Sequence, residues 1–264
     1  MNELTRRDAL SKVPEVTLIF WIIKIAATTL GETGGDTVTM TLNWGYLAGS
    51  TLFLGVLIVL VATQILAKKF QPLLYWATIV ASTTFGTTMA DFADRSLGIG
   101  YAGGSLLLAF CLLATLTAWR WLEGTVAVNT VSTPKVEAFY WAAITFSQTL
   151  GTALGDWSAD PLSEGGWGLG YGGGALVFGA GLLVLAVLYY STKVSRVFLF
   201  WAAFILTRPL GATVGDFLDK PIEHGGLAMS RPIASAALAV VIIALIFVLP
   251  QRAGNHPGRA EATA

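Results

Sequence analysis

Charged residues are scarce in this chain. They make up 12% of the 264 residues, and 16 Lys and Arg balance 16 Asp and Glu. A soluble domain carries about 25% charged residues. The low charge, a hydrophobic share of 55% and a mean hydropathy of +0.68 are typical of a polytopic membrane protein. The zero net charge gives no electrostatic footprint for nucleic-acid binding.

Cysteine and histidine are also rare, with one Cys and two His. A single thiol, Cys111 in an apolar run, excludes an internal disulfide and a zinc–thiolate cluster. Only His224 lies near the repeated motif described below, which argues against a soft-metal site. The sequence shows no Ser/His/Asp set, zinc-protease motif or phosphate-binding loop, and we therefore expect no enzyme activity. A retinal-based pump is disfavoured because the last apolar span has no lysine.

One sequence pattern occurs four times along the chain. A tryptophan stands ten residues before a glycine, an aspartate follows five residues after that glycine, and a small residue precedes each aspartate. Four gapless copies predict four tandem structural repeats. The copies are Trp21, Gly31 and Asp36; Trp76, Gly86 and Asp91; Trp141, Gly151 and Asp156; and Trp201, Gly211 and Asp216.

Eight apolar stretches are long enough to cross a membrane. We place them at 14–34, 44–66, 71–92, 99–121, 137–157, 169–190, 196–217 and 228–249. The predicted fold is an all-α membrane protein: eight transmembrane helices as four parallel-oriented helical-hairpin repeats around a pseudo-symmetry axis. The predicted organisation is a tail at 1–13, one transmembrane domain at 14–250 with repeats near 14–69, 70–124, 135–192 and 195–250, and a tail at 251–264.

The distribution of Lys and Arg predicts the topology. Eleven of them fall in the tails and even-numbered connections and five elsewhere, so both termini should be cytoplasmic. We expect a multi-pass protein of the bacterial cytoplasmic (inner) membrane, with the aspartates near the outer side. The four repeated tryptophans should then anchor the opposite interface.

The repeated glycines, each followed four residues later by a small residue, favour close packing of transmembrane helices. Gly31, Gly86, Gly151 and Gly211 are therefore assigned to helix packing, and the four odd helices should meet near one axis. After each aspartate the loops differ in length, which sorts repeats one and two from repeats three and four. Repeat four also replaces a Gly-Tyr-x-x-Gly helix start with Ser230, Arg231 and Pro232.

The four aspartates need compensation, because a charge at the bilayer centre costs about 3 kcal/mol. Further acids lie nearby in the sequence: Glu32, Asp94, Asp160 and Asp219. Protons, Lys and Arg, or a metal ion could offset this charge. Thr28 and Thr83 each lie three residues before a repeated glycine. Hydroxyl and carboxylate oxygens are hard ligands, which suit Mg²⁺, Ca²⁺ or Mn²⁺.

Repeat one carries Lys24 and Glu32, and repeat four carries Arg208, where the other repeats have uncharged residues. Intramembrane ionisable groups point to function. Lys24 is a candidate counter-ion for Glu32, although seven residues separate them. We assign Lys24 and Arg208 to charge tuning or proton coupling, and leave open a purely structural role as counter-charges.

The four aspartate segments, at 28–36, 83–91, 149–156 and 209–216, resemble a family of uncharacterised bacterial multi-pass membrane proteins built from four tandem two-helix repeats of unknown function. The resemblance covers roughly residues 14–249. It implies the architecture and assigns no chemistry.

The leading hypothesis is a transporter for a hard inorganic cation such as Mn²⁺, with proton-coupled export as one form of this activity. Its site would comprise Glu32, Asp36, Asp91, Asp156 and Asp216, with no cofactor beyond the ion itself. The expected partners are lipid, the cation and protons; self-association is left open. The alternatives are a non-transporting structural or sensor protein and a membrane enzyme that uses paired carboxylates.

Overall fold

The computed structural model describes residues 10–255, which form eight long helices and a small two-stranded sheet. Each helix coincides with a predicted span, and most ends agree within three residues. The first helix is the exception, because residues 10–14 form a strand and the helix begins at Leu18. The helices are α2 (Leu18–Asp36), α3 (Gly45–Leu66), α4 (Pro72–Asp91), α5 (Gly100–Glu123), α6 (Pro134–Ala159), α7 (Gly170–Ser191), α8 (Arg196–Asp219) and α9 (Arg231–Val248).

Helix starts follow local sequence signals. Thr17, Thr133 and Ser195 cap α2, α6 and α8 by accepting a backbone hydrogen bond through their hydroxyls. The chain enters α3 and α5 through glycines with positive φ, Gly45 and Gly100, a backbone conformation that other residues rarely adopt. The Gly-Tyr-x-x-Gly pattern of the sequence therefore marks the first residues of α3 and α5.

Five of the helices are long and apolar enough to cross a membrane: α3, α5, α7, α8 and α9. Helices α3, α5, α7 and α9 expose most of their apolar side chains, whereas about half of the most apolar window of α8 is buried. Such extensive apolar surface is characteristic of a membrane protein.

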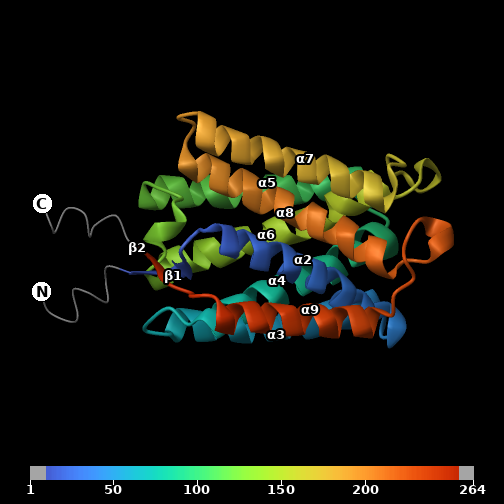
Figure 1. Cartoon of the computed structure of the whole chain (residues 1–264), viewed down its shortest axis with the longest axis horizontal. Coiled ribbons are helices and arrows are strands. Elements are labelled where there is room, and N and C mark those ends of the chain that lie inside the picture. The colour runs from blue at the N-terminus through green and yellow to red at the C-terminus, as the bar shows by residue number, and fades with distance from the viewer. Residues whose placement is uncertain (1–9, 256–264) are drawn as a thin grey trace, which may run out of the picture.

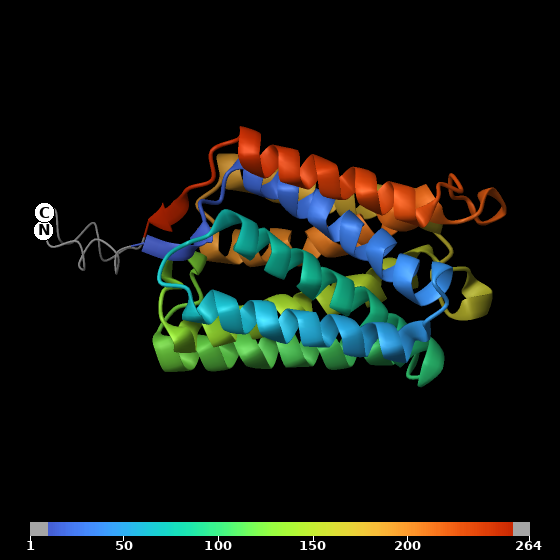
Figure 2. The same cartoon turned by 90° about the horizontal axis from the view of Figure 1, so that it is seen from below.

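The helices form an inner ring and an outer set. Helices α2, α4, α6 and α8 make the inner ring, in which each packs against two neighbours in the order α2, α4, α6, α8 and back to α2. The outer helices α3, α5, α7 and α9 lie along the outside of this ring (Figure 1, Figure 2). The inner ring thus contains the first helix of every repeat, as the glycine pattern predicts.

The two helices of one repeat pack together much less than the predicted hairpins require, and α6 with α7 is the most extensive of these contacts. Each outer helix instead lies along the inner helix of the following repeat, so that α3 packs on α4, α5 on α6 and α7 on α8. The links at 67–71 and 192–195 are shorter than any connection within a repeat, and they hold α3 beside α4 and α7 beside α8. The link between α5 and α6 is longer and contains the 3₁₀ helix η3 (Val128–Thr130).

The last pair, α9 and α2, is joined without a covalent link. Strand β1 (Leu10–Pro14), which precedes α2, pairs antiparallel with β2 (Ala253–Asn255), which follows α9. This sheet takes the place of the missing connection and closes the circle of helix pairs. It lies at one end of the bundle, called here the terminal end; the opposite end is called the acidic end (Figure 1).

The repeated glycines are the points where neighbouring inner helices touch. A Cβ added to any of them would come within 2.9 Å of the next inner helix. The residue met is always the one three positions before the next glycine: Gly31 meets Thr83, Gly86 meets Gln148, Gly151 meets Arg208 and Gly211 meets Thr28. The contacts run around the whole ring, so each of these glycines lies where two inner helices approach closely.

Along each inner helix, every fourth residue is buried, and these buried residues occupy equivalent positions in the four repeats. Each of them is at most 7% exposed. This spacing follows from the helical period, because residues four apart share a face. Five layers result, about 6 Å apart along the helices. From the terminal end they are the aromatic layer (Phe20, Tyr75, Tyr140, Phe200), the Lys24 layer (Lys24, Ile79, Ile144, Phe204), the Arg208 layer (Thr28, Thr83, Gln148, Arg208), the Glu32 layer (Glu32, Thr87, Thr152, Ala212) and the aspartate layer (Asp36, Asp91, Asp156, Asp216).

The terminal half of the bundle is an aromatic core. The Tyr75 and Tyr140 hydroxyls share a hydrogen bond of 2.6 Å. The prediction that the repeated tryptophans anchor a membrane interface is wrong for Trp76, Trp141 and Trp201, which are buried at 5% exposure or less. They pack within the protein because the ring of helices leaves room there for large side chains between neighbouring repeats.

A matched pair of substitutions in α2 tests the packing role of the glycines. Gly31→Ala should destabilise the protein by about 1–3 kcal/mol, because the new methyl group overpacks the contact with Thr83. Gly34→Ala should be neutral or stabilise it by up to about 1 kcal/mol, because its nearest neighbour is 4.0 Å away and alanine favours helix. Thermal unfolding in detergent measures both, and equal shifts for the two variants would contradict the close approach.

Candidate functional site

The inner helices end differently in the two halves of the chain. After Asp36 and Asp91 the helix continues as a π-helical turn, η1 (Thr37–Thr41) and η2 (Phe92–Ser96). Helices α6 and α8 instead run one turn beyond their aspartates and are followed by short 3₁₀ helices, η4 (Leu162–Glu164) and η5 (Ile222–His224). This division confirms the sorting of the repeats that the loop lengths indicate.

Arg95 organises one side of the aspartate layer. Its guanidinium lies 2.9 Å from Asp91, 3.3 Å from Asp160 and 3.8 Å from Asp156. Tyr101, in the first turn of α5, donates its hydroxyl hydrogen bond to Asp160. One arginine from the turn after α4 therefore joins carboxylates of α4 and α6.

Lys220 and Arg231 organise the opposite side. Lys220 Nζ lies 2.7 Å from Asp36 and 3.1 Å from Asp216. Arg231 Nε lies 3.4 Å from Asp219 and 3.6 Å from Asp36. These contacts join α2 and α8 at the acidic end, and Arg231 adds the first residue of α9.

Both loop cations remain charged in this setting. Burial lowers the pKa of Arg95, but the carboxylates of Asp156 and Asp91 outweigh burial and raise the pKa overall. Burial likewise lowers the pKa of Lys220, and Asp216 and Asp36 raise it well above its ordinary value. The side chains of Arg95 and Lys220 are 35% and 14% exposed, so these two cations lie at the partly exposed edge of the carboxylate cluster.

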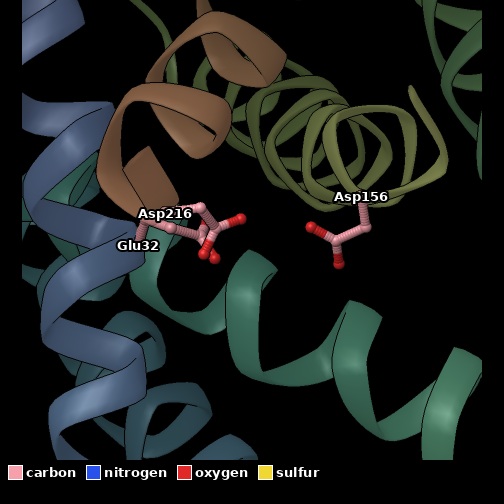
Figure 3. A group of neighbouring side chains, drawn as sticks. All are labelled: Glu32, Asp156 and Asp216. Atoms are coloured by element: carbon pink, nitrogen blue, oxygen red, sulfur yellow. The ribbon is translucent and has the colours of Figure 1, made fainter. Parts of the chain in front are cut away.

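Two groups of three carboxylates have oxygens within 4.8 Å of one another. One group is Glu32, Asp156 and Asp216, whose side chains come from α2, α6 and α8 (Figure 3). The other is Asp36, Asp216 and Asp219, which already hold Lys220 and Arg231. Because a Ca²⁺–oxygen bond is about 2.3–2.6 Å long, two such bonds can span about 5 Å. A single hard cation could therefore reach all three oxygens of the first group.

Arg208 lies one layer from Glu32 toward the terminal end and is fully buried. Its Nη2 donates to Glu32 Oε2 at 2.9 Å and to the hydroxyls of Thr87, at 2.6 Å, and Thr152. Residues of α2, α4 and α6 thus converge on a nitrogen supplied by α8. Thr87 and Thr152 were not predicted as partners of Arg208.

The suggested pairing of Lys24 with Glu32 is wrong. Lys24 is fully buried in the layer nearer the terminal end, where Nζ donates to Gln148 Oε1 at 3.2 Å and lies 4.1 Å from the centre of the Phe204 ring. Lys24 and Glu32 are eight positions apart along α2, which is too far for a direct contact, and Arg208 reaches Glu32 from the neighbouring helix instead. Lys24 makes no ion pair with a carboxylate among residues 10–255.

The remaining predicted residues lie beside this network. Thr28 donates its hydroxyl to the backbone oxygens of Ile25 and Thr207, so it acts in helix packing. Thr83 is buried in the same layer, and its hydroxyl has no hydrogen-bond partner within the described part of the chain. Asp94, on η2, packs against Gly104 of α5 and is separate from the other carboxylates.

The charges of this network do not balance. Within residues 10–255, seven buried carboxylates are linked by ion pairs to four cations. The carboxylates are Glu32, Asp36, Asp91, Asp156, Asp160, Asp216 and Asp219, and the cations are Arg95, Arg208, Lys220 and Arg231. Three carboxylates therefore need protons or a bound cation, since buried charge is stable only when it is compensated.

The sequence-based reasoning missed Arg95 and Lys220 as site residues, although a signal was present. Each follows a repeated aspartate by four residues, the spacing that places two side chains on one helix face. Gln148 gives no comparable signal, because its partner Lys24 comes from the helix across the ring.

The comparisons with known proteins agree with the repeat structure. The family model described as Repeat of Unknown Function (DUF347) matches residues 19–70, 74–125, 139–195 and 199–252. The chain belongs to the DUF347 family. Among curated proteins and solved structures, none matches it. Each DUF347 repeat contains one inner and one outer helix, and the charged network is built where four such repeats meet.

In this DUF347 protein, loss of Arg95 should leave three buried carboxylates without their shared cation. We expect Arg95→Gln to destabilise the fold by about 1.5–3 kcal/mol, the range for hydrogen bonds to charged groups. Arg196→Gln is the control, because Arg196 is exposed and should change stability by less than about 0.5 kcal/mol. Thermal unfolding in detergent compares them; similar small shifts would show that Arg95 is dispensable.

Asp94 should make stability depend on pH. Burial raises its pKa from 3.8 to about 6, against the opposing effect of Arg95. The folded state then holds this proton more tightly than the unfolded state, so stability falls as pH rises from about 4 to about 6. Asp94→Asn should therefore be more stable than wild type above that window and equal to it below.

Unfolding temperatures measured across this pH range give the comparison. Glu223→Gln, which changes an exposed acid, should keep the wild-type pH profile. A difference between Asp94→Asn and wild type that is independent of pH would contradict the effect of burial.

Proposed function

We propose that this protein is a membrane transporter for a hard divalent cation such as Mn²⁺, which binds between Glu32, Asp156 and Asp216. The observation that carries the proposal is the excess of buried carboxylates over cations in one network. Protons are the proposed counter-ions when the site holds no metal. Oxygen-only ligands, without Cys or His in the group, match the preference of hard cations.

The location of the group supports this proposal. Glu32, Asp156 and Asp216 belong to three inner helices that meet around the same axis, so a change in the packing of these helices would alter the group. The aromatic layer and the Tyr75–Tyr140 hydrogen bond fill the bundle toward the terminal end. The partly exposed cations lie at the acidic end. We therefore assign the approach of the ion to the acidic end in this conformation.

The membrane arrangement is part of the proposal. All eight helices would cross a bacterial inner membrane around a pseudo-symmetry axis, with cytoplasmic termini and an outward-facing acidic end. Helices α2, α4, α6 and α8 carry the Thr, Gly and acidic residues of the inner ring, and the apolar helices α3, α5, α7 and α9 would lie between the ring and lipid. The clustering of Lys and Arg at the terminal end supports this orientation.

The ion pairs favour a second candidate, a non-transporting bundle that acids and bases hold together. Each of the seven carboxylates has a cation within 4.0 Å, as such a bundle requires. Fixed pairing would, however, need about as many cations as carboxylates, because an unpaired buried charge is costly. The imbalance therefore favours an exchangeable cation.

The test measures Mn²⁺ flux into proteoliposomes that contain the purified full chain. Asp156→Asn and Asp216→Asn should each reduce flux at least tenfold, since even indirect partners of metal ligands change affinity by roughly 10–100-fold. The control is Glu164→Gln, an exposed acid in the turn after α6, which should keep the wild-type flux.

The expected pattern separates the two candidates. A transporter loses flux in the two aspartate variants while its helical content, measured by circular dichroism, stays unchanged. Absence of Mn²⁺ flux in the wild-type protein, or equal flux in all variants, would contradict the proposal and favour the non-transporting bundle.

A further inference from the structure

Arg208 is held in an unusual way for a structural arginine. A single nitrogen, Nη2, contacts three oxygens from three helices: Glu32 Oε2, Thr87 Oγ1 and Thr152 Oγ1. The other two nitrogens, Nε and Nη1, have no hydrogen-bond partner within residues 10–255. Arginines that bind carboxylates for stability commonly use two parallel hydrogen bonds. Here one nitrogen is surrounded as a small ion would be.

The oxygens around Nη2 form a ligand set for a hard cation. One carboxylate and two hydroxyls converge, and all three side chains are buried at 2% exposure or less. The fourth member of this layer, Ala212, has no oxygen and belongs to the helix that supplies Arg208. Hard cations prefer such oxygen ligands. The layer therefore has the composition of a cation site that is filled by a side chain.

Glu32 belongs both to this layer and to the group of three carboxylates formed with Asp156 and Asp216, called here the outer carboxylate group because it lies nearer the acidic end. It lies with Asp156 and Asp216 in the group whose oxygens are within 4.8 Å, while its Oε2 binds Arg208. A cation bound to the outer group and the guanidinium of Arg208 thus compete for the same carboxylate. Repulsion between the two positive charges acts in the same direction.

We propose that Glu32, Thr87 and Thr152 form a second, inner site for the transported cation, and that Arg208 fills it as a tethered ion that the incoming cation displaces. This inference deepens the proposed function, because it rests on the cation site at Glu32, Asp156 and Asp216. A tethered competitor weakens binding, which lets the ion leave again; a transport pathway needs sites from which ions can depart.

The first experiment measures Mn²⁺ binding to the purified full chain by the paramagnetic resonance signal of free Mn²⁺. Arg208→Ala should bind Mn²⁺ about tenfold more tightly than wild type, because no charge-assisted hydrogen bonds have to be broken. Arg196→Ala, which removes an exposed arginine at the start of the same helix, should leave the Kd unchanged. An unchanged or weaker Kd in Arg208→Ala would overturn the inference.

A second arm tests whether guanidinium and metal share one site. Free guanidinium ion at low millimolar concentration should raise the Mn²⁺ Kd of Arg208→Ala and leave that of wild type unchanged. It should also raise the unfolding temperature of Arg208→Ala, an effect that Glu32→Gln in the same background removes. Guanidinium without effect on either quantity would show that Arg208 is a fixed counter-charge.

The remaining outcomes separate this inference from the proposed function. If wild type binds no Mn²⁺ and Arg208→Ala still binds guanidinium through Glu32, the proposed Mn²⁺ function fails and the inner cation site stands. If wild type binds Mn²⁺ through Asp156 and Arg208→Ala binds Mn²⁺ no more tightly than wild type, the proposed function stands and the tethered-ion inference fails.

Should Arg208→Ala not fold, Arg208→Lys keeps the charge on a shorter side chain and should bind Mn²⁺ at least threefold more tightly than wild type. An unchanged Kd in Arg208→Lys overturns the inference.

Discussion

Neighbouring inner helices approach each other closely at Gly31, Gly86, Gly151 and Gly211, and the rest of the structure depends on this approach. A side chain at these positions would come within 2.9 Å of the next helix. With glycine there, four helices close into a ring narrow enough that side chains reach across it, as Lys24 does to Gln148. The stacked layers and the shared carboxylate groups follow from that distance.

The repeated frame supplies the positions, and the exceptions to the frame supply the chemistry. In the Arg208 layer, two repeats contribute threonine while the others contribute Gln148 and Arg208. In the Glu32 layer, Thr87 and Thr152 stand opposite an acid and an alanine. A fully symmetric ring would place four identical groups around the axis, and like charges would repel. Substituting single repeats lets a cation from one helix meet oxygens from the other three.

Charge compensation links the ring to its loops. Arg95 and Lys220 each follow a repeated aspartate by one helical turn and extend to carboxylates of a neighbouring helix. They bind the acidic end together, yet they leave the network with more carboxylates than cations. The same acids stabilise the ring through the loop cations and, in the proposed function, provide oxygens for an exchangeable ion. If the proposal holds, stability and ion binding share these groups, so the effect of a substitution here has to be measured on both.

Much of the architecture could be predicted from the amino-acid sequence. Apolar stretches predicted all eight helices, and the Trp, Gly and Asp frame predicted four repeats whose first helices meet at their glycines, because local periodicity records which helix face is buried. The sequence also located the acids at one depth. It did not reveal that each outer helix packs on the following repeat, or that β1 and β2 close the circle, because both depend on contacts between distant segments. Nor could it tell that Arg208, rather than Lys24, meets Glu32. Spacing along one helix excludes a contact between residues eight positions apart, but only the packing of α8 against α2 brings residues 176 positions apart within 2.9 Å.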